Sequence, residues 1–304
     1  MRYLITGGAG FIGSHIVDKL LENNKNSQIH ILDDLSSGKN INMGCIVHKT
    51  NICNNLAKIF EDNRIDIVIH TAAQVMVQKS IDFPVKDAEV NIFGSLNIIE
   101  NCRKYGVKKI IYLNSGGAVV GNAEKLPTDE KALINPLSPY GVSKYIAEQY
   151  LKVYNNLYDL KYMSLRLSNV YGPRQKASSE GGVIALFINN IMQKTNPVIF
   201  GDGLQTRDFI FVKDVADAVM LATKTENHTV NISTGKETTI KRVLDLVRKS
   251  TNSKISEITR PQKPGEVRRS VLSNKAAQKI LNWVPKTSLE DGIQKTVEYY
   301  KSLK

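Results

Sequence analysis

The sequence predicts an α/β protein with a doubly wound parallel sheet and a smaller, interleaved α/β substrate-binding domain. Short apolar runs alternate with segments of helical periodicity along the amino-terminal half, which is typical of parallel sheets with helices on both faces. A glycine-rich turn follows the first apolar run, and two aspartates follow the second. Because the carboxyl ends of parallel strands meet at one edge of a sheet, we expect the binding residues to gather there.

The first strand is expected at Tyr3–Ile5, and Gly7, Gly10 and Gly13 follow it in G-x-x-G-x-x-G spacing. The next apolar side chains recur at helical spacing, and they are Phe11, Ile12, Ile16, Val17 and Leu20. The glycines allow a tight turn, the approach of a phosphate and close packing of the helix on the strand. Since backbone N–H groups and the positive end of the helix then face a pyrophosphate, the segment predicts a dinucleotide site rather than a plain glycine-rich turn.

The second strand is expected at Gln28–Leu32, and Asp33 and Asp34 follow it. A carboxylate at this place accepts hydrogen bonds from the adenosine ribose and repels a 2′-phosphate, so NAD is favoured over NADP. Asp33 is the better candidate, because Asp34 starts the turn DLSSGK. Two alternatives stay open: the acidic pair forms only a turn, and the nearby Lys39 does not exclude NADP.

The remaining elements continue this alternation and loosen after Asn169. In the amino-terminal half, strands are expected at Ile65–Ile69, Lys109–Asn114 and Tyr162–Leu167, and long helices at Val85–Tyr105 and Pro139–Asp159. After Asn169, strands are expected at Pro197–Phe200 and Val230–Ser233, and helices at Val183–Met192, Lys213–Thr223, Thr239–Thr251, Ala276–Leu281 and Leu289–Leu303. This second set predicts a smaller domain that exchanges segments with the first.

The composition is that of an ordinary globular protein, with 42% hydrophobic and 23% charged residues among 304. We expect no membrane segment, because no apolar run approaches about 20 residues, and no signal peptide, because the first strand begins at Arg2. The net charge of +12 is dispersed, which favours attraction of an anionic nucleotide substrate over nucleic-acid binding. The cysteines and histidines lack metal-ligand spacing, so we expect no metal and a reducing, cytoplasmic location.

The segment Tyr140-Gly-Val-Ser-Lys144 carries the candidate chemistry. Positions i and i+4 share one face of a helix, so the Lys144 ammonium is expected beneath the Tyr140 phenol. A free phenol has a pKa of about 10, and this must fall by roughly three units, about 4 kcal/mol, before Tyr140 acts as a base near neutrality. An ammonium and a positive nicotinamide ring supply that stabilisation. The pair follows a strand that ends in Asn114-Ser-Gly-Gly117, which favours this interpretation over an exposed helix pair.

Eight segments carry a resemblance to a known family. In chain order they are TGGAGFIGSH, DDLSSG, HTAAQ, NSGGAVVG, SPYGVSK, LRLSNVYGPRQ, FGDGLQTRDFIFVKDVADA and PGEVRRS. With them the chain resembles the extended short-chain dehydrogenases/reductases, specifically the NAD-dependent epimerase/dehydratase family and within it the UDP-glucose (UDP-galactose) 4-epimerases. The resemblance implies a Rossmann domain that binds NAD over residues 1–168, with 206–234 returning to it, and a substrate-binding domain over 169–205 and 235–304.

The resemblance also implies roles for single residues. The expected catalytic residues are Ser115, Tyr140 and Lys144. The residues expected to hold NAD are Gly7, Gly10, Phe11, Ile12, Asp33, Asn51, Ile52, Ala72, Ala73, Gln74, Asn91, Tyr140 and Lys144. The residues expected to hold a UDP-sugar are Ser115, Asn169, Arg207, Lys263 and Ser270. Of these, Arg207 is expected to pair with the diphosphate through its guanidinium.

Four positions depart from the family pattern. Many relatives carry the catalytic Ser or Thr where this chain has Gly116, so Ser115 is expected to replace that hydroxyl only in part. The tyrosine usual in V-Y-G is Val120, and the usual aspartate at the adenine is Asn51. An arginine often precedes P-G-E, and the Lys263 found here weakens bidentate phosphate binding.

Within this family the sequence favours inversion of a UDP-sugar at C4. Dehydration needs an acid/base pair, and Gly116–Ala118 offers no carboxylate where dehydratases carry Thr-Asp-Glu. Epimerisation needs only Tyr140, Lys144, a hydroxyl donor and a retained NAD, and it passes through a transient 4-keto sugar. The alternatives are a nucleotide-sugar 4-keto reductase, a UDP-uronate epimerase and a non-catalytic NAD-binding regulator; the Tyr140–Lys144 pair disfavours the last.

Two further expectations rest on the same resemblance. Relatives pair two long helices into a four-helix bundle, so a homodimer is expected through Val85–Tyr105 and Pro139–Asp159. A bulky tyrosine restricts some relatives to plain hexoses, and this chain has the small Ser270 at that position. An N-acetyl group is therefore expected to fit, which adds UDP-N-acetylglucosamine to UDP-glucose as a candidate substrate.

Overall fold

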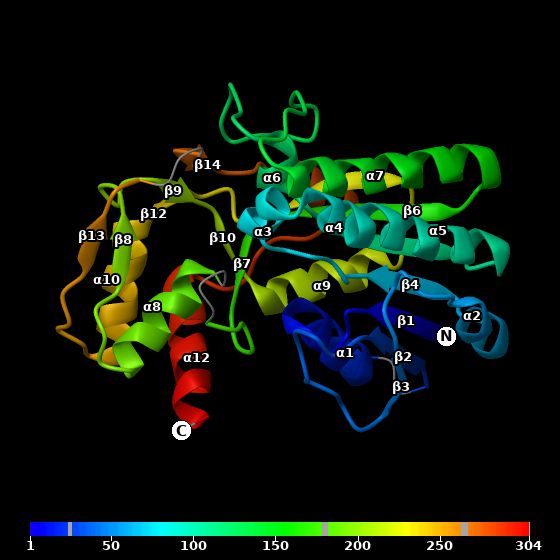
Figure 1. The fold of residues 1–304 in the computed structure, drawn as a ribbon, viewed down its shortest axis with the longest axis horizontal. Coiled ribbons are helices and arrows are strands. Elements are labelled where there is room, and N and C mark those ends of the chain that lie inside the picture. The colour runs from blue at the N-terminus through cyan, green and yellow to red at the C-terminus, as the bar shows by residue number, and fades with distance from the viewer. Residues whose placement is uncertain (24–25, 178–181, 263–266, 304) are drawn as a thin grey trace.

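A seven-stranded parallel sheet of order β11-β6-β5-β4-β1-β2-β3 forms the centre of the structure (Figure 1). The structure, a computed structural model, describes residues 1–23, 26–177, 182–262 and 267–303. The strands are β1 (Arg2–Thr6), β2 (Gln28–Asp33), β3 (Cys45–Lys49), β4 (Ile67–His70), β5 (Lys109–Ser115), β6 (Lys161–Leu167) and β11 (His228–Ile232). The chain winds from β1 to β3 and then crosses to β4 on the other side of β1, so a topological switch point lies between β1 and β4, where α/β sheets bind their ligands.

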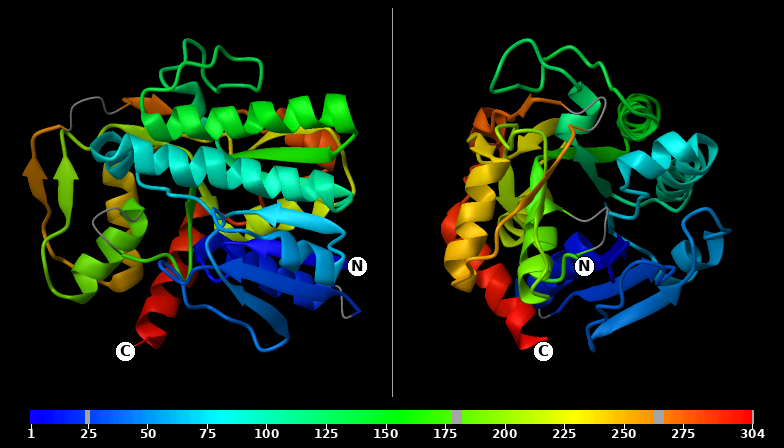
Figure 2. Two further views of the ribbon diagram at one scale, coloured as in Figure 1. Left: turned by 45° about the vertical axis from the view of Figure 1, so that its right-hand side comes forward. Right: turned by 60° about the vertical axis from the view of Figure 1, so that its left-hand side comes forward.

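Helices cover both faces of this sheet (Figure 2). They are α1 (Phe11–Asn23) and α9 (Val212–Ala222) on one face, and α2 (Ala57–Asn63), α5 (Ser95–Lys104) and α7 (Pro139–Tyr158) on the other. Because successive side chains of a strand point to opposite faces, Tyr3 and Ile5 join the core under α1, whereas Leu4 joins the core under α5. Burial on both faces explains why β1 reads as a continuous apolar run.

The helix expected at Val85–Tyr105 is divided into three parts. It begins as α4 (Pro84–Ala88), continues as the π-helical segment η1 (Glu89–Gly94) and ends as α5. Single π-helical turns inside α-helices occur frequently at functional sites. Within η1, Asn91 is buried and its side chain turns to groups of the site described below.

A second group of elements lies beside the carboxyl edge of the sheet, at the left of Figure 1. Its helices α8 (Val183–Met192), α10 (Ile240–Thr251) and α12 (Leu289–Ser302) share one apolar core. Short strands surround them, namely β7 (Asn169–Tyr171), β8 (Val198–Phe200), β9 (Thr206–Arg207), β10 (Phe209–Phe211), β12 (Thr238–Thr239), β13 (Ile258–Arg260) and β14 (Arg269–Ser270). The helix α11 (Lys275–Leu281) packs against α9 and β11.

The other predicted helices and strands are present within about two residues of their expected bounds. Sequence reasoning did not identify β3, α2, α3 (Val77–Asp82), α6 (Gly116–Val120) or, apart from β8, the strands of two or three residues. These pieces are too short to show a clear hydrophobic period. Among the helices of the described residues, none combines the length and the apolar character that a membrane span requires.

Candidate active site

Glycines build the turn between β1 and α1. Gly7 has a φ of +68°, a left-handed conformation that favours glycine, and a Cβ there would lie 2.8 Å from a backbone nitrogen just after β4. A Cβ on Gly13 would lie 2.2 Å from the Gly7 carbonyl oxygen, so α1 packs directly on the turn. The Gly10 N–H donates to the same carbonyl at 3.0 Å. Phe11 and Ile12 begin α1, where backbone N–H groups have no acceptor within the helix. This side-chain-free turn fits a pyrophosphate.

Asp33 ends β2, beside the same turn. Its Oδ2 accepts a hydrogen bond from the Ala9 N–H at 3.0 Å, and its Oδ1 accepts one from the Leu35 N–H at 2.8 Å. Burial raises the pKa of this carboxyl, and the two hydrogen bonds act against that rise. Asp33 therefore ties the end of β2 to the glycine turn, a role that sequence reasoning did not anticipate. Its contact with a ribose stays a prediction.

Asn51 and Ile52 follow β3 and lie in different surroundings. The Asn51 amide donates to the Asp34 carboxylate at 2.9 Å, so it extends the acidic end of β2. The Ile52 side chain is buried, and a Cβ on Gly94 would lie 2.6 Å from its Cδ1. Ile52 is thus packed against η1 in the protein core, and its contact with an adenine stays a prediction.

The half-buried segment Ala72-Ala73-Gln74 follows β4, across the switch point from the glycine turn. The Ala72 N–H donates to the Thr6 hydroxyl at 3.2 Å. Gln74 and Asn91 exchange two hydrogen bonds: the Gln74 N–H donates to the Asn91 side-chain oxygen, and the Asn91 amide donates to the Gln74 carbonyl, both at 2.9 Å. The π-helical segment therefore fixes the position of Ala72-Ala73-Gln74, the segment that is predicted to line the cofactor.

Ser115 lies at the carboxyl end of β5 and supplies the hydroxyl that hydrogen-bonds Tyr140. At the neighbouring Gly116, a Cβ would lie 2.3 Å from Cδ1 of Leu272. A serine at that position requires the end of the Leu272 side chain to shift, whereas Ser115 already supplies a hydroxyl to Tyr140. The structure thereby explains how the hydroxyl is retained although Gly116 stands where many relatives have it.

The first turn of α7 places Tyr140 against α6. Ser138 caps the helix, because its side-chain oxygen accepts a hydrogen bond from the Gly141 N–H at 3.2 Å. Pro139 occupies the first turn, where the absence of a backbone N–H in proline costs no helical hydrogen bond. A Cβ on Gly141 would lie 2.2 Å from the Ala118 carbonyl oxygen. The glycine of the Y-G-x-S-K segment therefore lets α7 approach the turn that carries Ser115.

Tyr140 and Lys144 are both buried. Burial raises the pKa of Tyr140 to about 12, and the hydrogen bond with Ser115 acts against that rise. Burial lowers the pKa of Lys144 to about 7. The Lys144 Nζ donates to the Leu113 carbonyl at 2.7 Å and lies 4.1 Å from the centre of the Tyr112 ring. The protein alone thus disfavours the phenolate, so ionisation of Tyr140 requires additional positive charge.

Two predicted substrate residues, Arg207 and Ser270, are direct neighbours in the short sheet of β9 and β14. The Ser270 Oγ lies 3.1 Å from the place of a Cβ on Gly117, so it faces the turn that begins at Ser115. Residues more than 60 positions apart are thus brought to one place. Asn169 is exposed in β7, where its N–H donates to the Asp208 carbonyl at 2.9 Å. Lys263 lies outside the described residues.

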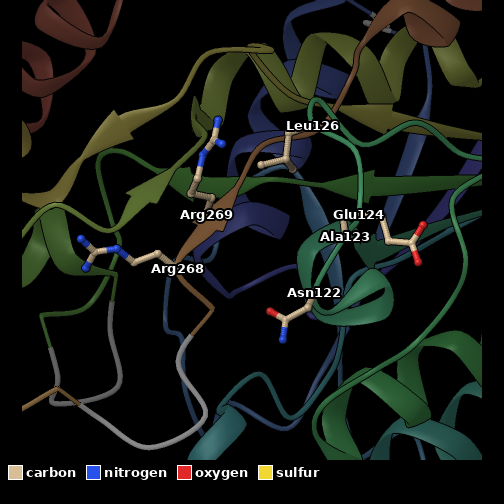
Figure 3. Close-up of a pocket in the computed structure, with 6 residues that line it drawn as sticks. All are labelled: Asn122, Ala123, Glu124, Leu126, Arg268 and Arg269. Carbon is tan, nitrogen blue, oxygen red and sulfur yellow. The ribbon is translucent and has the colours of Figure 1, made fainter.

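A cavity of about 390 Å³ lies between the start of β14 and the loop that follows α6 (Figure 3). One wall carries Arg268 and Arg269, and the other carries Asn122, Ala123, Glu124 and Leu126. Each arginine is engaged by a carboxylate: Arg268 by Asp202 at 2.7 and 2.8 Å, and Arg269 by Glu237 at 2.6 and 3.0 Å. Arg268 and Arg269 therefore belong to ion pairs that fix β14.

Buried acidic residues near Lys144 escaped the sequence reasoning. Asp87 accepts a hydrogen bond from Ser143 at 2.7 Å, and Glu148 binds Arg166 at 2.7 and 3.0 Å. Helical spacing carried the missing signal, because Asp87 precedes Asn91 by four residues and Glu148 follows Lys144 by four.

Comparison with known proteins gives consistent results. The model of the NAD-dependent epimerase/dehydratase family matches residues 3–233. The chain is 38% identical to the UDP-glucose 4-epimerase of Mycolicibacterium smegmatis, over 99% of both chains.

Solved structures agree over the whole fold. The UDP-glucose 4-epimerase of Thermotoga maritima, solved with UDP-glucose, superposes with a TM-score of 0.97 at 42% identity and 100% coverage of both chains. The UDP-glucose 4-epimerase of Thermus thermophilus, solved with NAD, superposes with a TM-score of 0.94 at 37% identity and 99% coverage of both chains.

Proposed function

The chain belongs to the NAD-dependent epimerase/dehydratase family, and from this we propose that it inverts C4 of a UDP-sugar through a transient 4-keto intermediate. The proposed substrates are the UDP-glucose/UDP-galactose pair or the corresponding N-acetylhexosamine pair. The observation that carries the proposal is the assembly of Ser115, Tyr140 and Lys144 at the carboxyl end of β5, with Ser270 facing the same place. The enzyme is accordingly an isomerase that uses bound NAD.

The residues present fit NAD. The turn at Gly7 and Gly10 leaves room for a pyrophosphate, the first amides of α1 are available as donors, and Asp33 provides a carboxylate at the end of β2. When bound, NAD accepts a hydride at its nicotinamide ring and returns it. An NAD that remains bound needs no external reductant, which suits an isomerase.

The protein residues supply the proton chemistry. We assign Tyr140 as the base that takes the O4 proton and later returns it, and Ser115 as the hydroxyl that orients O4. Since burial raises the pKa of Tyr140 to about 12, its action as a base depends on positive charge from Lys144 and an oxidised nicotinamide. Arg207 is assigned to the diphosphate, where a guanidinium binds two oxygens.

The 4-keto reductase and the UDP-uronate epimerase remain the alternative activities, because both use the same three residues. They differ in what they consume and release: a reductase needs a stoichiometric external hydride donor, and a uronate epimerase needs a sugar carboxylate. A non-catalytic NAD-binding role is disfavoured, since the described structure brings the hydroxyl and the phenol into contact.

We further propose a homodimer through α4, η1, α5 and α7. These helices expose apolar side chains that soluble monomers usually bury, among them Val85, Phe93, Val153 and Leu157. Phe93 is 68% exposed and Leu157 is 65% exposed. A second copy of the same face covers such a patch by two-fold symmetry.

Two other aspects of the proposal concern organisation and location. We propose that 1–168 with 206–234 form the NAD-binding domain, and that 169–205 with 235–304 form the substrate-binding domain. The pairing of β11 with β6 supports the return of the chain to the first domain. Cys45, Cys53 and Cys102 are free thiols, which supports a cytoplasmic location.

The deciding experiment incubates purified protein with UDP-glucose, UDP-N-acetylglucosamine and UDP-glucuronate separately, without added cofactor, in deuterated water. We expect the C4 epimer of at least one of the first two, with no solvent deuterium at C4, because the hydride returns directly. Tyr140→Phe serves as the control and is expected to lose most turnover while it retains NAD. Product only from UDP-glucuronate, or product only with added NADH, selects the corresponding alternative.

A further inference from the structure

Asp87 is a deeply buried carboxylate whose hydrogen-bond donors, among the described residues, are all neutral. Only 1% of its surface is exposed. Its Oδ2 accepts the Ser143 hydroxyl at 2.7 Å, and its Oδ1 accepts the Gln74 and Asn91 amides at 2.8 and 2.9 Å. These three donors come from α7, from the loop after β4 and from η1. A buried negative charge is costly unless a cation compensates it, and one buried cation interacts electrostatically with Asp87.

That cation is Lys144, which directly follows Ser143 on α7. Its side chain is buried, and its contacts, the Leu113 carbonyl and the Tyr112 ring, carry no formal charge. The titratable groups around it are Tyr140 and Glu148 on α7, Tyr112 on β5, His70 on β4 and Asp87 on α4.

Of the two carboxylates in this set, Glu148 is already compensated. It binds Arg166 at 2.7 Å and lies 3.3 Å from the Lys152 Nζ. His70 is held between the hydroxyls of Thr6 and Ser95, and its burial keeps it neutral. Among the described residues, the Asp87 carboxylate is therefore the uncompensated negative charge that acts on Lys144.

We propose that Asp87 is a positioning residue whose carboxylate, oriented by Gln74, Asn91 and Ser143, keeps Lys144 in its ammonium form beside Tyr140. The inference rests on the proposed epimerase function and extends it to a residue that does not touch the substrate. It also gives Gln74 and Asn91 a second role, because these predicted cofactor residues hold Asp87 in place.

The sign of the effect follows from charge. The Asp87 carboxylate raises the pKa of Lys144 against the effect of burial, and it also raises the pKa of Tyr140. Activity requires a charged Lys144 and a Tyr140 that can lose its proton. Removal of the Asp87 charge therefore moves both limbs of the pH profile of kcat to lower pH. Loss of packing alone lowers the whole profile without moving it.

The test compares pH profiles of kcat for the wild-type protein and Asp87→Asn, which retains the shape of the side chain. We expect the optimum to shift by about one pH unit toward acid, the size typical of a nearby charge. Bound NAD, measured after denaturation, is expected to stay unchanged. The matched control is Asp214→Asn. Asp214 is also buried, and within the described part of the chain its carboxylate accepts the Lys286 and Thr287 backbone N–H groups at 3.2 and 3.0 Å and no group from the surroundings of Asp87. Its optimum is expected to stay in place.

A second readout needs no turnover. In protein labelled with ¹³C-lysine, the titration of Lys144 is followed by NMR and assigned with Lys144→Arg. We expect Asp87→Asn to lower the midpoint by about one pH unit. Should Asp87→Asn fail to fold, Asp87→Ser offers a smaller neutral acceptor and is measured in the same way.

Ser143→Ala separates charge from hydrogen bonding, because it removes a donor and leaves the carboxylate. We expect its optimum and Lys144 midpoint to lie near the wild-type values. Unshifted profiles in the neutral Asp87 variants, or equal shifts in Ser143→Ala, overturn the inference. Absence of C4 epimerisation by the wild-type protein overturns the proposed function instead, and the Lys144 titration still decides the role of Asp87.

Discussion

The hydroxyl that faces Tyr140 comes from Ser115, and a steric contact explains why. Leu272 fills the space beside Gly116, so a side chain at that position requires the end of Leu272 to shift. The requirement for a hydroxyl is then satisfied one residue earlier, at the end of β5. At this scale, position in space rather than position in a motif decides which residue serves.

Asp33→Ala tests the choice of cofactor. The change removes the carboxylate at the end of β2, so we expect NAD binding to weaken by about tenfold or more. We also expect the difference between the affinities for NAD and NADP to become smaller. Binding is measured by titration with both dinucleotides. Asp34→Ala is the control, because Asp34 is exposed and is expected to have a smaller effect. Tighter binding of NADP than of NAD by the unmutated protein contradicts the assignment.

Ser270→Tyr tests the pocket beside the sugar. Ser270 faces Gly117 and lies opposite Arg207, so a larger ring at this place reduces the room for a C2 substituent. We expect kcat/KM for UDP-N-acetylglucosamine to fall about tenfold more than that for UDP-glucose. The conservative control Ser270→Ala is expected to preserve the ratio. Equal losses on both substrates show that Ser270 does not line the pocket.

At the scale of elements, α7 is positioned by contacts at two places along its length. Gly141 allows its first turn to approach α6, and Glu148, one turn after Lys144, binds β5 and β6. The Asn114 amide and the Ser164 hydroxyl donate to the same carboxylate as Arg166. These contacts hold Tyr140 and Lys144 in place relative to Ser115.

Glu148→Gln tests this anchor. Loss of one partner leaves Arg166 buried without its counter-charge, so we expect the free energy of unfolding to fall by about 3 to 5 kcal/mol. Denaturant unfolding measures this free energy. The control is Glu290→Gln in the exposed Arg242–Glu290 pair, which is expected to lower the free energy of unfolding by about 1 kcal/mol or less. A similar small loss in both variants contradicts the anchor.

The same pair predicts the pH dependence of stability. Burial raises the pKa of Glu148, but the hydrogen bond and charge of Arg166 outweigh it and leave the pKa below its usual value. A carboxyl whose pKa is lowered by folding stabilises the protein above the pKa of the unfolded chain. That contribution is lost as the pH falls below about 4.

At the scale of the whole molecule, two groups of elements meet at the carboxyl edge of the sheet (Figure 1). The glycine turn and Tyr140 come from the seven-stranded sheet and its helices, whereas Arg207 and Ser270 come from the short sheet of β12, β9 and β14. A site made from both groups requires the chain to pass between them several times. The pairing of β11 with β6 shows one such passage, because it returns the chain to the seven-stranded sheet.

The proposed dimer is tested by light scattering. We expect a mass near twice the 33.9 kDa of the chain at micromolar concentration. Phe93→Glu places a charge on the exposed apolar face of η1 and is expected to yield monomers. The control Val284→Glu changes an apolar residue that is 51% exposed but lies outside these helices, and it is expected to leave the mass unchanged. A monomeric wild-type protein contradicts the proposal.

The sequence by itself determined the fold class, most strands and helices, and the candidate residues at the glycine turn and at Tyr140 and Lys144. These features depend on local patterns: glycine spacing, apolar periodicity and the i, i+4 relation along a helix. Such patterns are complete within about 20 residues, so no contact between distant segments was needed to read them.

Only the tertiary structure decided which hydroxyl reaches Tyr140, which residue stands opposite Arg207, and which carboxylate lies near Lys144. Ser115 depends on Leu272, Ser270 depends on the register of β9 with β14, and Asp87 depends on α4 packing against α7. The physical reason is shared by all three. Each contact joins residues far apart in the chain, and its geometry follows from packing that no local pattern encodes.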